Sequence, residues 1–258
     1  MARAPQTPKS ALINVMSQAV YKAARGIVRD FGELSHLQIT RKSIGDFVSS
    51  ADKRSEKILI EELKKARPSF GFLCEESGEI PGQDNRHRWI IDPLDGTTNF
   101  LHSNPHFAIT VALEFDDEII AGVTYQPILD ELFWAEKGKG AFCNQKRLRV
   151  SGRRDLESLL ICCTHDHPIG AKIKNQISGV RYTGSAALEL AYVAAGRFDV
   201  CFLEGLKAWD MAAGLLLIKE AGGVITKTNG SPLNIYEESV LCANEFLHKD
   251  FLPMVKGS

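Results

Sequence analysis

The sequence predicts an α/β (α+β) layered sandwich, in which helix layers and sheet layers alternate. Apolar residues recur at helical spacing over residues 10–31. Apolar and polar residues alternate between residues 107 and 150, with turn residues between the runs, as in an antiparallel meander. After residue 159 a strand, a helix and a strand follow one another. Helices, a meander and a strand–helix alternation in this order indicate stacked layers.

Length and composition describe an ordinary globular protein. The 258 residues suit one domain, residues 1–258, built from two packed lobes at roughly 1–150 and 151–258. Apolar residues make up 44% of the chain and the formal net charge is −1, a balance that gives no reason to expect nucleic acid or a membrane as a partner.

The cysteines and the N-terminal residues favour a cytoplasmic protein. The six cysteines are scattered without a Cys-x-x-Cys pair, which is typical of reduced and mostly buried thiols. Residues 1–10 are polar and lack the apolar segment of a signal peptide, and no later stretch is long enough to span a bilayer.

Two helices are expected in the first part of the chain. Ser10 can cap a helix that runs through about Phe31. Residues 42–52 then lead into a second helix that ends at Ala66, before a proline. Asp52 would lie near the start of this second helix, where the helix dipole favours an acid.

A strand from Gly71 to Cys74 is expected next, and it ends at Glu75 and Glu76. Consecutive strand residues point to opposite faces, so only one of these glutamates can face a shared site. Paired glutamates are otherwise typical of a solvated surface.

The most informative stretch follows. An apolar run, Trp89–Ile91, is followed by two acids, Asp92 and Asp95. Pro93 makes the turn between them rigid. Gly96 allows a close backbone approach, so free N–H groups at a helix start could face an anion. Two acids aimed at one point repel each other unless a cation lies between them, and Mg²⁺ prefers oxygen ligands. We therefore favour a phosphate-ester site, with a plain structural turn as the alternative.

Two other motifs can be excluded for this stretch. An EF-hand loop fails because Pro93 and Leu94 fill the gap between the acids and Ser103 stands at the twelfth position. A haloacid-dehalogenase-type aspartyl nucleophile fails because Pro93 occupies its position. Attack by water is favoured instead.

The region 107–150 is expected to be scaffold. Lys137 and Lys139 flank a glycine, but no helix follows and the Walker spacing is missing, so a hairpin turn is the interpretation.

The second half is expected to contain, in order, a strand, a helix and a strand, at Leu159–Cys163, about Ser185–Ala195 and Phe198–Leu203. The segment His165-Asp166-His167 lacks a matching set of metal ligands elsewhere and is interpreted as a polar loop.

Asp210 stands near the start of a nearly all-apolar helix that runs through Ala221, and a helix cap is its plain structural interpretation.

The segment Asp92–Thr97 resembles the signature Asp-Pro-(Leu/Ile)-Asp-Gly-Thr of the inositol monophosphatase family of Mg²⁺-dependent, lithium-sensitive phosphatases. Thr98-Asn99-Phe100 resembles its monophosphatase branch rather than the adenosine-bisphosphate phosphatases. Trp209-Asp210, followed by a small-residue helix and Glu220–Gly223, resembles the second signature. The resemblance covers nearly the whole chain. It implies the sugar-phosphatase fold, with alternating helix and sheet layers, a site between the lobes, and a homodimer.

The resemblance also implies roles for individual residues. Two or three Mg²⁺ ions would be held, the first two about 3.5–4 Å apart, by Glu75, Asp92, the Leu94 carbonyl, Asp95 and Asp210. Glu75 is the first acid of the family's Glu-Glu-Ser motif, and it counts with Asp52 and Thr97 among the catalytic residues. Asp46 and Asp52 match an Asp-x-Val-Thr-x-x-Asp pattern, whose second acid hydrogen-bonds the motif threonine and helps to activate water.

Substrate contacts follow from the same resemblance. The Gly96 and Thr97 amides would hold the phosphoryl group, Asp210 would also contact substrate, and Gly184, Ser185 and Ala186 would contact the polyol ring. Many relatives carry a hydroxyl-binding glutamate seven residues before the aspartate of the second signature. Here that position is Leu203, and Glu204 stands one residue later. We expect Glu204 to take this role.

The expected reaction is hydrolysis of a small phosphate monoester, myo-inositol 1-phosphate, by in-line attack of metal-activated water. A fructose-1,6-bisphosphatase or another sugar or nucleotide phosphatase of the same superfamily is the alternative within the enzyme class. A metal-binding regulatory module without turnover is the alternative from a different class.

Overall fold

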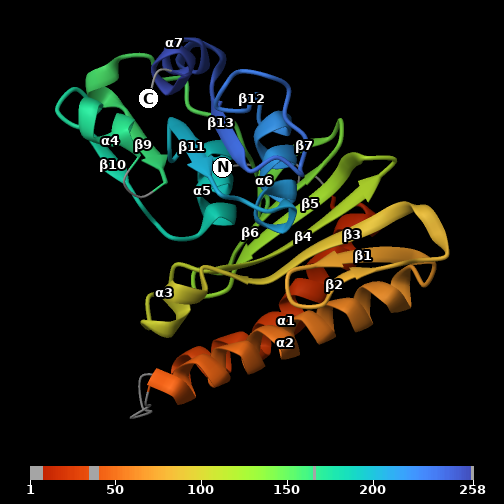
Figure 1. Ribbon diagram of the computed structural model, residues 1–258. Coiled ribbons are helices and arrows are strands. Elements are labelled where there is room, and N and C mark those ends of the chain that lie inside the picture. The colour runs from red at the N-terminus through yellow and green to blue at the C-terminus, as the bar shows by residue number, and fades with distance from the viewer. Residues whose placement is uncertain (1–7, 35–40, 165–166, 257–258) are drawn as a thin grey trace, which may run out of the picture.

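The computed structural model describes residues 8–34, 41–164 and 167–256, with the backbone alone for residues 41–49. Five layers follow one another: a helix pair, an eight-stranded sheet, a second helix pair, a five-stranded sheet and an outer helix layer (Figure 1). This arrangement confirms the predicted layered α/β fold.

The first layer consists of α1 (Ala11–Leu34) and α2 (Arg41–Ala66), which lie along one face of the large sheet (Figure 1). Ser10 caps α1, because its Oγ accepts a hydrogen bond from the Ile13 N–H at 3.2 Å. The second helix begins earlier than expected, since Ile44, Phe47, Val48 and Ala51 already follow helical spacing.

Asp52 therefore lies in the interior of α2, and its predicted place near the helix start was wrong. The dipole of a helix acts on charges in its first turn, so it does not explain an acid at this position.

The large sheet has the strand order β2-β1-β3-β4-β5-β6-β7-β8. Its strands are β1 (Phe70–Cys74), β2 (Gly78–Ile80), β3 (Asp84–Asp95), β4 (Ala108–Phe115), β5 (Glu118–Gln126), β6 (Glu131–Glu136), β7 (Gly140–Cys143) and β8 (Lys146–Arg147). From β3 onward each strand pairs antiparallel with the next, which confirms the meander, and Lys137 and Lys139 lie in the hairpin between β6 and β7.

One parallel pair in this sheet matters for the site. β1 runs parallel to β3, with Cys74 opposite Ile91. Parallel strands end at the same edge of a sheet, so Glu75 and Asp92 emerge side by side. The short helix α3 (Thr97–Leu101) follows β3 directly.

The second sheet has the order β10-β9-β11-β13-β12. Its strands are β9 (Leu160–Cys163), β10 (Gly179–Arg181), β11 (Val200–Glu204), β12 (Val224–Thr226) and β13 (Ser239–Ala243), and the helices around it are η1 (Leu156–Ser158), α4 (Pro168–Ile173), α5 (Ala186–Ala194), α6 (Ala208–Glu220) and α7 (Glu245–Lys256). The strand, helix and strand predicted here are present within two residues of the expected bounds, whereas β10, β12, β13, α4 and α7 were not predicted.

Helices α5 and α6 fill the space between the two sheets, and α4 and α7 cover the far face of the second sheet (Figure 1). Small residues let α6 approach the large sheet closely. A Cβ atom added to Gly122 would lie 2.8 Å from the Cα of Ala213, so this strand position requires glycine. Five of the six cysteines are buried, as expected. No helix in the described ranges is both long and apolar enough to cross a membrane.

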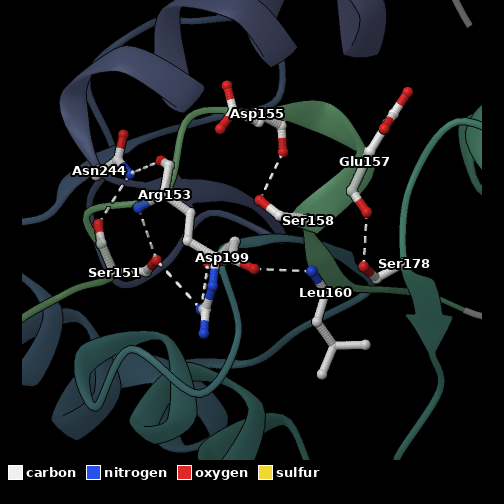
Figure 2. A network of polar contacts seen from close by, with 9 residues as sticks. All are labelled: Ser151, Arg153, Asp155, Glu157, Ser158, Leu160, Ser178, Asp199 and Asn244. Carbon is white, nitrogen blue, oxygen red and sulfur yellow. Dashed lines mark hydrogen bonds and ion pairs between the residues drawn. The ribbon is translucent and has the colours of Figure 1, made fainter.

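The segment before β9, residues 151–158, is tied to the second sheet by a polar network (Figure 2). Buried Asp199 accepts hydrogen bonds from the Leu160 N–H at 2.7 Å and from the Arg153 guanidinium at 3.0 Å. The Asn244 amide donates to the carbonyl oxygens of Ser151 and Arg153, at 2.8 and 2.9 Å.

Asn244→Ala is expected to lower the free energy of unfolding by about 2–4 kcal/mol. The substitution leaves two backbone carbonyls without their donor and removes the oxygen that caps α7 through the Leu247 N–H at 2.9 Å. Urea unfolding measures the change, with the exposed Asn229→Ala as the matched control at less than about 1 kcal/mol. Equal losses in the two variants would contradict the role given to this network.

Candidate active site

Three aspartates from distant parts of the chain meet in one place. Asp92 and Asp95, at the end of β3, and Asp210, in the first turn of α6, each offer a carboxylate oxygen within 4.8 Å of the others. Asp92 and Asp95 are buried, at 2% and 9% exposed. The fold thus brings together the aspartates that the sequence predicted as metal ligands.

The irregular last residues of β3, where the pairing with β4 shifts register between Asp92 and Asp95, are fixed on both sides. Asp92 Oδ1 accepts from the Leu94 N–H at 2.9 Å, and the Ser55 hydroxyl of α2 donates to the Pro93 carbonyl at 3.0 Å. The Thr97 hydroxyl donates to the Leu94 carbonyl at 3.1 Å. A carbonyl oxygen has two lone pairs, so this one keeps an acceptor position for another partner.

Asp95 is held from the other half of the chain. Its Oδ2 accepts from the Ser185 hydroxyl and from the Ala187 N–H, the latter at 3.0 Å. The next residue, Gly96, has a φ of 92°, and a Cβ there would lie 3.0 Å from the His106 carbonyl oxygen. Both the backbone conformation and the lack of space require glycine at this position.

Asp210 is the third residue of α6, and its Oδ2 accepts from the Lys207 N–H at 2.7 Å. An acid in the first turn that reaches back to the preceding backbone is a stabilising helix-end contact. This contact occupies one carboxylate oxygen and leaves the other for the aspartate group.

Glu75, a further predicted ligand, lies in the turn after β1 and is not one of the three acids that gather within 4.8 Å among the described residues. Its N–H donates to the Ile91 carbonyl at 3.1 Å, and its carboxyl shares a hydrogen bond with that of Asp92. The turn after it is anchored by Glu56 of α2, whose carboxylate accepts from the Glu76 N–H at 2.9 Å and from the Ser77 hydroxyl.

Ser55 and Glu56 were not predicted to support the site. They lie three and four residues after Asp52 on α2, so helical spacing places all three on one face of the helix. This spacing is the signal that could have identified them.

The acids raise one another's pKa values. Burial raises the pKa of Asp92 well above its ordinary value, and the charges of Asp95, Glu75 and Asp210 add to this effect. Burial also raises the pKa of Asp95 to about 7, against the hydrogen bond from Ser185. The pKa values of Glu75 and Asp210 are raised as well, with burial as the main cause. A divalent cation would relieve the repulsion between these carboxylates. Their oxygen atoms are the kind of ligand that Mg²⁺ prefers.

Asp52 is a buried acid next to this group. Burial, followed by the charges of Glu76, Glu75 and Glu56, raises its pKa to about 7. Its Oδ1 atom is buried and has no hydrogen-bond partner among the residues whose side chains the structure describes.

The hydrogen bond predicted between Asp52 and Thr97 is not seen at this oxygen. A hydroxyl group has one hydrogen to donate, and that of Thr97 goes to the Leu94 carbonyl. The side chain of Asp46 lies outside the described residues.

The predicted ring-contacting residues lie beside Asp95. Ser185 caps α5 and is 1% exposed, while Gly184 and Ala186 on either side of it remain accessible. Glu204 is exposed at the end of β11, where its N–H donates to the Thr164 hydroxyl at 2.8 Å. Within the described part of the chain its carboxylate makes no hydrogen bond or ion pair, so the structure leaves its role as a prediction.

His167 has a structural role. Its Nδ1 accepts from the Ile169 N–H at 3.3 Å and so caps α4, and its ring packs against Phe202 with centroids 4.8 Å apart. His165 and Asp166 lie outside the described residues.

Comparison with known proteins agrees with this geometry. The chain matches the model of the inositol monophosphatase family over residues 9–256. The inositol-1-monophosphatase of Mesorhizobium japonicum is 51% identical over 96% of this chain and 97% of its own length. The Nus factor SuhB of Escherichia coli K12 is 37% identical over 93% of this chain and 94% of its own length. The solved structure of the extragenic suppressor protein suhB from Bartonella henselae aligns with a TM-score of 0.88 at 48% identity, over 96% of this chain and 100% of that one.

Proposed function

The chain belongs to the inositol monophosphatase family, and we propose on this basis that it hydrolyses myo-inositol 1-phosphate to inositol and phosphate. The observation that supports this most is the meeting of Asp92, Asp95 and Asp210 within 4.8 Å. Relatives carry two kinds of name, inositol-1-monophosphatase and Nus factor. We favour turnover because the inositol-1-monophosphatase of Mesorhizobium japonicum is 51% identical to this chain, whereas the Nus factor of Escherichia coli is 37% identical.

The protein ligands of the cation would all be oxygen atoms, and water would complete its coordination. Glu75, Asp92, Asp95 and Asp210 supply carboxylates, and Leu94 supplies its carbonyl. Bound Mg²⁺ supplies positive charge that makes water more acidic and offsets charge on the leaving oxygen. The Gly96 and Thr97 N–H groups would donate to the phosphoryl oxygens.

Asp52 and Thr97 would prepare the attacking water. The Thr97 hydroxyl gives its hydrogen to Leu94, so its oxygen is free to accept one from water. Within the described side chains Asp52 Oδ1 has no hydrogen-bond partner, and the pKa of this carboxyl, about 7, is matched to accepting a proton near neutral pH.

Phosphate release from a panel of substrates tests the proposal. With Mg²⁺ present, myo-inositol 1-phosphate is expected to be the preferred substrate over fructose 1,6-bisphosphate and nucleoside monophosphates. A clear preference for fructose 1,6-bisphosphate would reject myo-inositol 1-phosphate as the substrate. The absence of Mg²⁺-dependent phosphate release from every compound would reject the enzymatic function.

Mg²⁺ is expected to stabilise the protein more at about pH 8 than at about pH 5.5. The pKa of Asp95 is about 7 in the folded protein and near 4 in an unfolded chain. In the metal-free protein this acid therefore costs stability above pH 7, and the cost disappears as the pH falls from about 7 towards 4. Melting temperatures with and without Mg²⁺ measure the effect. A larger Mg²⁺ shift at the lower pH would contradict the proposed ligands.

Occupancy by two or three Mg²⁺ ions, lithium sensitivity and a homodimer remain predictions from the family resemblance, and a cytoplasmic location remains a prediction from the cysteines and the N-terminal residues. Calorimetric titration with Mg²⁺ counts the ions, and sedimentation equilibrium determines the oligomeric state.

A further inference from the structure

The residues that hold Asp95 belong to one short turn, residues 183–187, which precedes and starts α5. Its Ser185 hydroxyl and Ala187 N–H both donate to Oδ2 of Asp95, so Oδ1 remains for a cation. The orientation of Asp95 thus depends on the position of a turn that comes from the other half of the chain. Two side chains fix that turn, one from each half.

Asn99 of α3 fixes the turn from the side of the large sheet. Its amide nitrogen donates to the Thr183 carbonyl at 2.7 Å and to the His106 carbonyl at 2.8 Å, while its oxygen accepts from the Asn104 amide at 2.9 Å. One nitrogen with two hydrogens is needed to satisfy two carbonyls at once. A Cβ on Gly184 would lie 3.1 Å from this nitrogen, so glycine there permits the close contact.

Glu189 of α5 fixes the turn from the other side. Its Oε1 accepts from the Thr183 N–H at 2.9 Å and from the Thr183 hydroxyl at 2.7 Å, and the Gly184 N–H also donates to this carboxylate. The side chain is 4% exposed, so these bonds are shielded from water.

We propose that Asn99 and Glu189 are positioning residues of the cation site, acting through the turn at 183–187 on Asp95. The inference rests on the proposed function, because it assigns these residues to the site where the cation would bind. Neither residue needs to touch the cation or the substrate. Partners that orient a metal ligand change metal affinity by about 10- to 100-fold when removed.

Mn²⁺ binding to the intact protein, followed by the loss of the free-ion electron paramagnetic resonance signal, tests this without turnover. Asn99→Ala is expected to raise the dissociation constant about 10-fold or more, and the exposed Asn229→Ala, in the loop after β12, is expected to leave it unchanged. An unchanged constant in a folded Asn99→Ala protein would overturn the proposal.

Glu189 offers a second test in case Asn99→Ala does not fold. Glu189→Gln keeps an oxygen that can accept from Thr183, whereas Glu189→Ala removes it, and both lose the charge. We expect Mn²⁺ affinity within about 3-fold of the wild type for glutamine and a loss of about 10-fold for alanine. Equal affinities in the two variants would show that the hydrogen bonds to the turn do not position Asp95.

The same measurements separate this proposal from the proposed function. A wild-type protein that binds Mn²⁺ but releases no phosphate would reject the phosphatase function and still allow the variants to be compared. A wild-type protein that hydrolyses substrate, with full Mn²⁺ affinity in Asn99→Ala, would reject the positioning role alone.

Discussion

Asp92→Asn is expected to lower Mg²⁺-dependent phosphate release by a factor on the order of 10³, the scale of losing one principal electrostatic contact in a catalytic site. The same substitution is expected to stabilise the metal-free protein. Burial, with the charges of Asp95 and Glu75, raises the pKa of Asp92 well above its ordinary value. A neutral amide of the same shape removes the cost of burying a charge beside other acids. It keeps an oxygen that can accept the hydrogen bond from the Leu94 N–H.

The stability gain follows from the direction of the pKa shift. An acid whose pKa is raised by folding destabilises the folded state at any pH above its unfolded pKa, near 4, and the cost grows up to the folded pKa. At pH 8 we expect Asp92→Asn to raise the melting temperature of the metal-free protein by about 2–6 °C. At pH 4.5 the gain should nearly vanish.

Phosphate release and thermal unfolding in EDTA measure the two effects on one protein preparation. Asp117→Asn is the matched control, because Asp117 is an exposed turn residue with a φ of 62°, a conformation that asparagine tolerates. Loss of activity together with loss of stability would point to a damaged fold, and unchanged activity would remove Asp92 from the cation site.

The fold could be predicted where the hydrophobic pattern was long. The meander and α1 each contain several repeats of their period, and the structure has both. Short elements such as β10, with three residues, contain too little of a period to be seen in the sequence. In α7 the buried residues Leu247, Phe251 and Val255 follow helical spacing, but Pro253 interrupts the segment.

The site could be predicted where its acids lie close together in the sequence or within a family signature. Asp92 and Asp95 share one turn, and the signature around Asp210 marked the third member of the group. Helical spacing could have suggested supporting residues such as Ser55, but not the atoms that they contact, because each contact depends on how distant segments pack. Ser55 reaches the Pro93 carbonyl across 38 residues, and Asn99 reaches the Thr183 carbonyl across 84. Nothing in the local sequence of either residue specifies its partner.

The hydrogen bond predicted between Asp52 and Thr97 also depends on how distant segments pack. The sequence contains both residues at the expected places, but the folded geometry, not the residue types, decides which acceptor takes the one hydroxyl hydrogen. The Leu94 carbonyl, three residues before Thr97, lies close enough to accept it.

Glu75→Gln is expected to lower phosphate release by at least about 10²-fold, whereas Glu76→Gln should cost less than about 5-fold. The two residues are neighbours, yet only Glu75 shares a hydrogen bond with Asp92. The charge of Asp210 also raises the pKa of Glu75. The turn that sets this difference is held by Glu56 through the backbone N–H of residue 76, a contact that the Glu76→Gln variant keeps.

Half-saturation by Mg²⁺, measured alongside the rate, separates the roles of the two glutamates. A metal ligand lost at position 75 should raise the Mg²⁺ concentration needed for half-maximal rate, because one carboxylate donor is gone. Glu76 is not among the proposed ligands, and its charge contributes to the raised pKa values of Asp52 and Glu75. Its replacement should therefore shift the acidic limb of the pH–rate profile to lower pH and leave the Mg²⁺ requirement unchanged. Equal losses in rate and in Mg²⁺ affinity for the two variants would mean that the turn after β1 does not select one glutamate for the cation.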